Sequence, residues 1–242
     1  MLATPHSRWA AFAIHLAISA FVFIALAAVI IFVWYPGFLF QTDGGWQGIR
    51  LIAGIDLILG PLLTLIVYNK AKKSLPIDLS IIALVQISAL CAGSYLVYQE
   101  RPLAIIFADN KFITMSHNSF AFSGLNPEEI PLVQQHKKPV WIYASSQPNM
   151  PGETNTQAFA RLGPKHLRVE DYRRFSDYKN NLYNEGVLQL EKQQSFKATD
   201  NIRYLKMISR YFEGYLAFDI ANEKVIHTII TNSTDVYGVR SN

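Results

Sequence analysis

The stretch Gly48–Tyr68, with the sequence GIRLIAGIDLILGPLLTLIVY, constrains the fold more than any other part of the chain. It is long enough to cross a bilayer, because about 20 apolar residues span the hydrocarbon core. It also carries one carboxylate, Asp56. A charged side chain at that depth is costly and usually faces protein or water, so Asp56 is a candidate functional residue.

A small and polar stripe accompanies this carboxylate. Asp56, Gly60 and Thr64 follow one another at intervals of four residues and therefore share one helix face. Pro61 lacks the backbone N–H that would bond the preceding turn, and this predicts a kink. A stripe of this kind suits contact with another helix better than contact with lipid. We therefore expect an intramembrane binding site formed by Asp56, Gly60, Pro61 and Thr64, together with Gln86 of a later stretch.

Two further apolar stretches predict that residues 1–98 form a transmembrane domain. Its three expected spans are residues 9–35, 48–68 and 77–98. The alternative for the first stretch is a signal peptide, whose apolar region has about 7–15 residues. Here the apolar run is longer and ends in Trp34-Tyr35-Pro36, which resembles an interfacial aromatic belt, so a retained helix is favoured.

Charge in the loops predicts the orientation. Lys70, Lys72 and Lys73 lie between the second and third spans, whereas the loop 36–49 has no Lys or Arg. The positive-inside rule makes the lysine loop cytoplasmic. The N-terminus is then inside and residues 99–242 outside, which in a Gram-negative cell means a multi-pass inner-membrane protein with a periplasmic domain.

Two more polar side chains are expected inside the bundle. His15 lies about 10 Å from the cytoplasmic end of the first span, and Asp56 about 10 Å from the opposite end of the second. In a core about 30 Å thick they differ in depth by roughly 10 Å, so a direct pair is not expected. Hydrogen bonds between helices are the favoured role of His15 and Gln86. For Asp56, a structural role and a functional role are expected about equally.

Residues 99–242 have the pattern of an α+β domain with antiparallel hairpins. One hairpin is expected over 103–117, turning at Asp109-Asn110, and another over 215–231. The other expected elements are strands at 140–144 and 202–209, and helices beginning at Pro127 and covering 156–162 and 170–193.

Composition and motifs exclude several classes of function. Residues 99–242 hold 17 Lys/Arg and 15 Asp/Glu, so a pI of 9.1 does not indicate a nucleic-acid partner. The single cysteine, Cys91, allows no disulfide within the chain. This part contains no GxSxG, HExxH, Walker or GxGxxG motif, and its histidines lack metal-ligand spacing. We therefore expect no cofactor, no metal and no enzymatic activity.

The charge-dense segment 168–179 is either a solvated helix face or a protein-binding surface.

The segment Ile55–Leu65 (IDLILGPLLTL) resembles the signature of the TfpX/TfpZ family of type IV pilin accessory proteins. Asp78–Gln86, the exit Tyr98–Pro102 and Asp109–Phe112 are also similar to that family. The resemblance covers residues 45–115 and is looser beyond them. It implies three inner-membrane helices, a periplasmic domain, and a role in the assembly of one type IV pilin.

The first functional hypothesis is an inner-membrane accessory protein that binds a type IV major pilin and aids its assembly or surface display. Its expected partners are that pilin, the lipid bilayer and other pilus assembly proteins. The alternative is a membrane enzyme, a transferase or hydrolase, that modifies pilin or glycan. A sensor is a third class, but the expected cytoplasmic segments are too short for an output domain.

Overall fold

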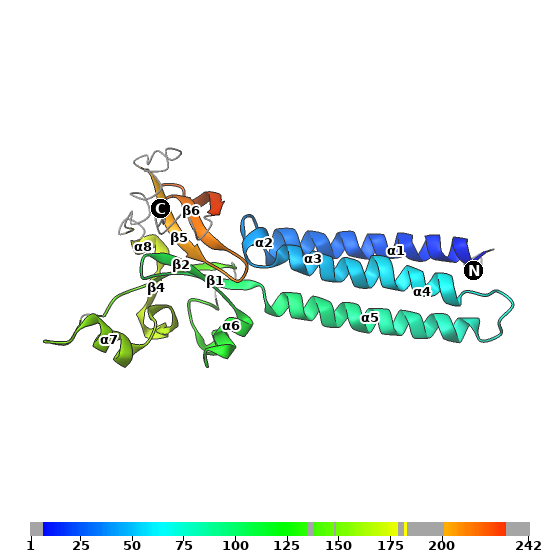
Figure 1. Ribbon diagram of the computed structural model, residues 1–242, viewed down its shortest axis with the longest axis horizontal. Coiled ribbons are helices and arrows are strands. Elements are labelled where there is room, and N and C mark those ends of the chain that lie inside the picture. The colour runs from blue at the N-terminus through cyan, green and yellow to red at the C-terminus, as the bar shows by residue number, and fades with distance from the viewer. Residues whose placement is uncertain (1–6, 135–137, 148, 179–181, 183–200, 231–242) are drawn as a thin grey trace, which may run out of the picture. The chain divides into compact units, whose positions relative to one another are not determined.

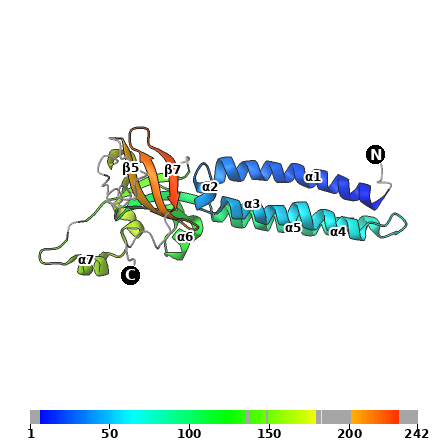
Figure 2. The same ribbon diagram turned by 45° about the horizontal axis from the view of Figure 1, so that its top comes forward.

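The chain forms two compact units in a computed structural model, and we describe each by itself (Figures 1 and 2). The first unit comprises Met1–Phe40 and Gly44–Arg101, and the second comprises Gln41–Asp43 and Pro102–Asn242. The structure describes residues 7–134, 138–147, 149–178, 182 and 201–230.

The first unit is helical. Its elements are α1 (Arg8–Val29) with the π-helical η1 (Ile30–Trp34), the run α3 (Gly45–Ala53), η2 (Gly54–Leu59) and α4 (Gly60–Val67), and α5 (Leu75–Gln99). The short helix α2 (Leu39–Thr42) begins in this unit, and its last two residues belong to the second unit. Three continuous helical stretches, Arg8–Trp34, Gly45–Val67 and Leu75–Gln99, are long and apolar enough to cross a membrane. They coincide with the three expected spans to within a few residues.

The irregularity expected at Pro61 takes the form of a π-helical segment. Residues Gly54–Leu59 form η2, and α4 follows at Gly60 with Pro61 in its first turn. Pro61 has no N–H for the preceding turn and its ring crowds that turn, so the regular α-helical hydrogen-bond pattern is interrupted there. The wider π turn places Asp56 in the middle of this segment.

A buried tyrosine contacts α5 near the end of that helix. The Tyr35 hydroxyl donates to the carbonyl of Val97 at 2.8 Å, and both residues belong to a buried cluster with Ile30 and Ile52. Gly48 of α3 faces the same place, since a Cβ there would stand 2.8 Å from Cγ1 of Val97. Glycine therefore lets α3 and α5 approach closely.

The second unit is built on one seven-stranded sheet, ordered β4-β3-β1-β2-β5-β6-β7. Its strands are β1 (Pro102–Ala108), β2 (Lys111–Ser116), β3 (Val140–Ala144), β4 (Tyr172–Arg174), β5 (Ile202–Ile208), β6 (Glu213–Asp219) and β7 (Lys224–Ile230). Figure 1 shows β1 and β2 in green and the later strands β5 and β6 in orange.

The sheet is mixed, which corrects the expectation of antiparallel hairpins alone. Both expected hairpins are present, and Asp109 and Asn110 take the left-handed conformation that a tight hairpin turn needs, with φ of 49° and 57°. However, β1 also pairs with β3, and β2 with β5, in parallel. Parallel pairing needs a long crossover rather than a tight turn, so no local sequence signal marks it.

Strand β1 is buried along its whole length and separates two parts of the core. On one side Ala104 and Ile106 pack with Phe120 of α6 (His117–Phe122) and with Ile130. A second group consists of four mutually packed aromatic rings, with centroids 5.3–5.8 Å apart: Phe112, Trp141, Phe175 and Phe218. This ring group joins β2, β3, the short helix α8 (Phe175–Tyr178) and β6.

The helix expected over 170–193 is not present where the structure describes that range. Val169–Asp171 is a 3₁₀ turn (η5), Tyr172–Arg174 is β4, and Phe175–Tyr178 is the short helix α8. Pairing of β4 with β3 overrides the local helical preference. Residues 179–181 and 183–193 lie outside the described residues.

The helix expected from Pro127 is one 3₁₀ turn (η3, Pro127–Glu129), whereas the helix expected over 156–162 is present as α7 (Asn155–Leu162).

Three residues that precede α3 in sequence belong to the second unit. The carbonyl of Thr42 accepts hydrogen bonds from the N–H of Tyr211 at 3.0 Å and from the hydroxyl of Ser209 at 2.7 Å. Asp43 is buried, and Thr42 and Thr114 hydrogen-bond its carboxyl group. Burial outweighs these bonds and raises the pKa of Asp43 from 3.8 to about 6.

We expect the raised pKa of Asp43 to make the second unit more stable in mild acid. The folded form takes up a proton near pH 6, the unfolded form only near pH 4, so stability rises as pH falls through this window. The gain is about 3 kcal/mol, since one pKa unit corresponds to about 1.4 kcal/mol. Asp43→Asn should remove this pH dependence and stabilise the unit at pH 8.

Hydrogen exchange of peptides from β2, β5 and β6, corrected for the intrinsic effect of pH, measures this slope in the full chain. Asp177→Asn is the matched control, because Asp177 is exposed and should leave the slope unchanged. An equal slope in Asp43→Asn and in the unsubstituted protein would contradict the assignment to Asp43.

Candidate functional site

Five polar side chains meet inside the first unit, between the helices that are long enough to cross a membrane. They come from α1, η2, α4 and α5, and they are His15, Ser19, Asp56, Thr64 and Gln86. We call them the polar cluster. Hydrogen bonds connect all five into one network that joins three helical stretches.

The side-chain amide of Gln86 is the centre of this network. Its Nε2 donates to Oδ1 of Asp56 at 2.6 Å and to the hydroxyl of Ser19 at 3.2 Å. Its Oε1 lies 2.9 Å from Nε2 of His15. An amide can donate and accept at once, so Gln86 connects an acid on one helix with an imidazole on another.

The partners of His15 define which ring nitrogen carries the proton. Oε1 of Gln86 has no hydrogen, so Nε2 of His15 is the donor of that bond. In the neutral ring, Nδ1 then accepts from the hydroxyl of Thr64, 2.6 Å away. Both ring nitrogens are therefore bonded within the bundle.

Asp56 lies in the interior of the first unit, with only 3% of its surface exposed. Its Oδ1 accepts from the Ser19 hydroxyl at 2.9 Å as well as from Gln86. Its Oδ2 has no hydrogen-bond partner among the described residues. The carboxylate thus contacts other helices of its own chain, and its second oxygen is an unused acceptor.

Gly60 provides the space that Gln86 occupies. A Cβ placed at Gly60 would collide with the amide group of Gln86. Pro61 and Thr64, on the same helix, are also buried. The stripe of small residues predicted on this helix therefore leaves room for a polar side chain from α5.

A groove of about 410 Å³ opens beside the cluster, between α1, α4 and α5. Its polar lining is formed by His15, Ser19, Thr64 and Gln86, so four of the five cluster residues contribute to it. The rest of the lining is mainly aliphatic and includes Ile14, Ile18, Leu79 and Leu90. Asp56 is not among the lining residues and lies behind Gln86 and Ser19.

The predicted site residues come together in part as expected. Asp56, Thr64 and Gln86 share one network, Gly60 makes room for it, and Pro61 shapes the backbone beside it. His15 and Asp56 are connected through the side-chain amide of Gln86, which bonds to both of them. Whether these residues bind a partner stays a prediction.

Sequence reasoning missed Ser19. It is almost fully buried, donates to Asp56 and accepts from Gln86. Its spacing of four residues from His15 places the two side chains on one face of α1, and that spacing was the available signal.

The fold and the cluster define a class of protein in which three apolar helices, long enough to cross a membrane, enclose a polar network and precede a mixed-sheet domain. Comparison with known proteins adds the family. The chain is 38% identical over 124 residues to the fimbrial assembly protein of serogroup E1 of Dichelobacter nodosus, and 37% identical over 124 residues to that of serogroup I. Each match covers 50% of this chain and 48% of the relative.

A third relative is the fimbrial assembly protein of serogroups C1 and C2 of the same organism. Identity is 43% over 96 residues, covering 39% of this chain and 73% of the relative. The chain therefore belongs to the family of these fimbrial assembly proteins, although it matches only about half the length of the first two relatives. No family model and no solved structure matches it.

Proposed function

We propose that this protein is an inner-membrane accessory factor that helps a type IV pilin to assemble by binding the membrane helix of the pilin subunit. Two facts support the proposal. Its relatives are fimbrial assembly proteins, and its helical unit contains an open groove beside a polar cluster. The groove is the observation that carries the choice of partner.

The lining of the groove suits a helix. Its walls are aliphatic, and two small residues, Ala11 and Ala83, permit close approach of another backbone. Small residues at contact sites drive helix association in lipid, and polar side chains such as His15 and Gln86 add hydrogen bonds. A pilin awaiting assembly presents an apolar helix in the membrane and a globular head outside it, so a bundle with an attached domain can contact both.

The role proposed for the cluster is binding rather than catalysis. Each of its members is hydrogen-bonded to another member, and Asp56 is buried behind two of them. Among the residues that the structure describes, the cluster has no second carboxylate to form an acid–base pair with Asp56. These features favour an accessory protein over a transferase or hydrolase.

The topology proposed with this function places the N-terminus in the cytoplasm and the second unit in the periplasm. It rests on the three lysines between α4 and α5, Lys70, Lys72 and Lys73. Alkaline phosphatase is active only in the periplasm, so a fusion after Asn242 should be active and a fusion after Lys73 inactive. The reverse pattern would rule this orientation out.

Crosslinking in cells tests the groove. A photoreactive amino acid replaces Ile18, which lines the groove, or Ala17, which is exposed at nearly the same depth but lies about 100° round the helix. Pilin should be captured from position 18 and not from position 17. Equal capture from both positions, or none from position 18, would reject the groove as the pilin site.

A further inference from the structure

A second cavity lies in the second unit, between α7 and the loop that follows β3. It has a volume of about 390 Å³, within the range of about 300–1,000 Å³ typical of small-molecule sites. It is distinct from the groove of the helical unit. Its lining is rich in amide and hydroxyl side chains, which belong to Ser146, Gln147, Asn149 and Asn155.

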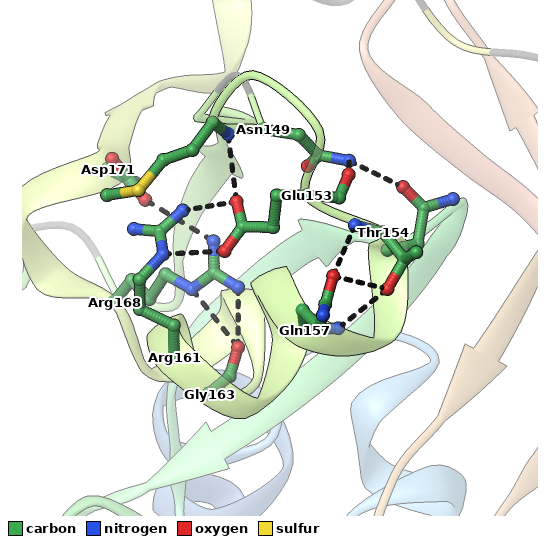
Figure 3. Close-up of polar contacts among 10 residues, drawn as sticks. Asn149, Glu153, Thr154, Gln157, Arg161, Gly163, Arg168 and Asp171 are labelled. Atoms are coloured by element: carbon green, nitrogen blue, oxygen red, sulfur yellow. Dashed lines mark hydrogen bonds and ion pairs between the residues drawn. The ribbon is translucent and has the colours of Figure 1, made fainter.

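One wall of this cleft is fixed by a bidentate ion pair. Nε and Nη2 of Arg161 each donate to a carboxylate oxygen of Glu153 at 2.8 Å, and Glu153 also accepts from the N–H of Met150 at 2.9 Å (Figure 3). Thr154 and Gln157 form a capping box at the start of α7. Paired, planar contacts of this kind hold the loop against the helix, so the cleft exists before any ligand arrives.

The other wall is held by Arg168, which is only 7% exposed. Its Nε donates to the carbonyl oxygens of Leu162 and Gly163, both at 3.1 Å, as Figure 3 shows for Gly163. Arg168 and its neighbour Asp171 are buried outside any long helix, so a solvated helix face is the wrong interpretation for these two residues. They are part of the framework of the cleft.

An unused acceptor lies behind this wall. Asp171 is 4% exposed, and its Oδ1 accepts from Nε2 of Gln147 at 2.9 Å. Its Oδ2 accepts no hydrogen bond from the described residues and stands 4.0 Å from Nη1 of Arg168. Gln147 and Arg168 both line the cleft, so a bound hydroxyl group could bond to either and extend this network.

Charge in the cleft is balanced. Lys165 pairs with Asp109 at 2.7 Å, and Arg168 lies beside Asp171. Each cation that lines the cleft thus has an acid next to it. A site with paired charges offers little net attraction to an anion or a cation, so the ligand it suits is neutral.

The remaining lining residue that matters is Phe159. Its ring lies on α7, lines the cleft and is 56% exposed. An exposed aromatic face beside several amides suits a molecule with an apolar C–H face and a rim of hydroxyl groups. We propose that the cleft binds a neutral saccharide of one or two rings. The proposal does not depend on pilin binding by the helical unit.

Binding of sugars to the full-length protein tests this proposal. The protein is purified in a zwitterionic detergent without a sugar headgroup, and glucose, maltose, N-acetylglucosamine and its disaccharide are titrated by calorimetry and saturation-transfer NMR. At least one sugar should bind with a dissociation constant on the order of 1 mM or tighter. Tighter binding of N-acetylglucosamine and its disaccharide indicates that the ligand is a cell-wall type of glycan. Tighter binding of glucose and maltose indicates that the ligand is a hexose glycan.

Two variants and one matched control locate the binding. Phe159→Ala should weaken it at least tenfold, and Ser146→Tyr should block the cleft. Phe122→Ala removes an aromatic ring that is 96% exposed outside the cleft and should change nothing. Circular dichroism checks that all three remain folded. Absence of binding by all four sugars, unchanged affinity in both cleft variants, or binding of trialanine in place of sugar would each overturn the proposal.

Discussion

Gly60→Ala is expected to destabilise the helical unit by several kcal/mol and to reduce the amount of protein in the membrane. The added methyl group would collide with the amide of Gln86, which cannot move without losing its bonds to Asp56 and His15. Overpacking costs about 1–3 kcal/mol, and hydrogen bonds between membrane helices are worth about 0.6–2 kcal/mol each. Together these give about 2–7 kcal/mol, measured by unfolding in mixed micelles of mild detergent and SDS.

Gly54→Ala is the matched control. Gly54 lies on the same helical run, but a Cβ there would have no atom within 4 Å outside its neighbours. It should be neutral or slightly stabilising, because alanine favours a helix more than glycine does. In a Gln86→Ala background the cost of Gly60→Ala should nearly vanish. Equal losses in Gly54→Ala and Gly60→Ala, or a cost of Gly60→Ala that persists without Gln86, would disprove the steric explanation.

Asp56→Leu is expected to have the second large effect, and Asp56→Asn a small one. Leucine removes the carboxylate oxygen to which Ser19 and Gln86 both donate. The described residues of the polar cluster include no other carboxylate that could replace it. Unpaired buried groups cost about 1–3 kcal/mol each, so the loss for these two donors should be about 2–6 kcal/mol. Asparagine keeps one oxygen for both donors and should cost less than about 1 kcal/mol.

The same two variants separate folding from partner binding. Asp56 lies behind the lining of the groove. Pilin should therefore co-purify with Asp56→Asn at a near-normal level when the two proteins are compared at equal amounts in the membrane. Asp56→Leu should lose pilin in proportion to its loss of folded protein. A full loss of pilin in Asp56→Asn, with unchanged stability, would instead show that the charge itself contacts the partner.

The helical unit could be predicted well because its signals are local. Length and hydropathy define the three stretches, and Pro61 alone indicates the irregular turn before α4. The partners of Asp56 could not be predicted in the same way. Ser19 and Gln86 are 37 and 30 residues away from it in the chain, and their contact depends on how three helices are rotated about their axes. A single sequence contains no direct measure of that rotation.

The second unit shows the same limit in its sheet. Hairpins are local, so the turn at Asp109-Asn110 predicts β1 and β2 correctly. The pairs β1–β3 and β2–β5 join segments that lie far apart in sequence, and the pattern of each strand alone is compatible with several neighbours. The helix expected over 170–193 is wrong for its described part, 170–178, for a related reason. Its polar composition favours a helix, but pairing with β3 and burial of Tyr172 and Phe175 decide its structure.

The seam between β2 and β5 has a consequence for how such chains can diversify. It consists of three residue pairs, between 111–113 and 206–208, while β5, β6 and β7 form a continuous meander over 202–230. A segment that is contiguous in the gene and pairs with the rest of the sheet along a short seam can be exchanged as a block by recombination. Among the described residues, contacts of this block outside the seam include the ring of Phe218, which packs in the four-ring aromatic group, and the hydrogen bonds of Ser209 and Tyr211 to the carbonyl of Thr42. We infer that related chains can acquire new C-terminal surfaces in this way, and a chimera that carries a relative's meander but fails to fold would refute it.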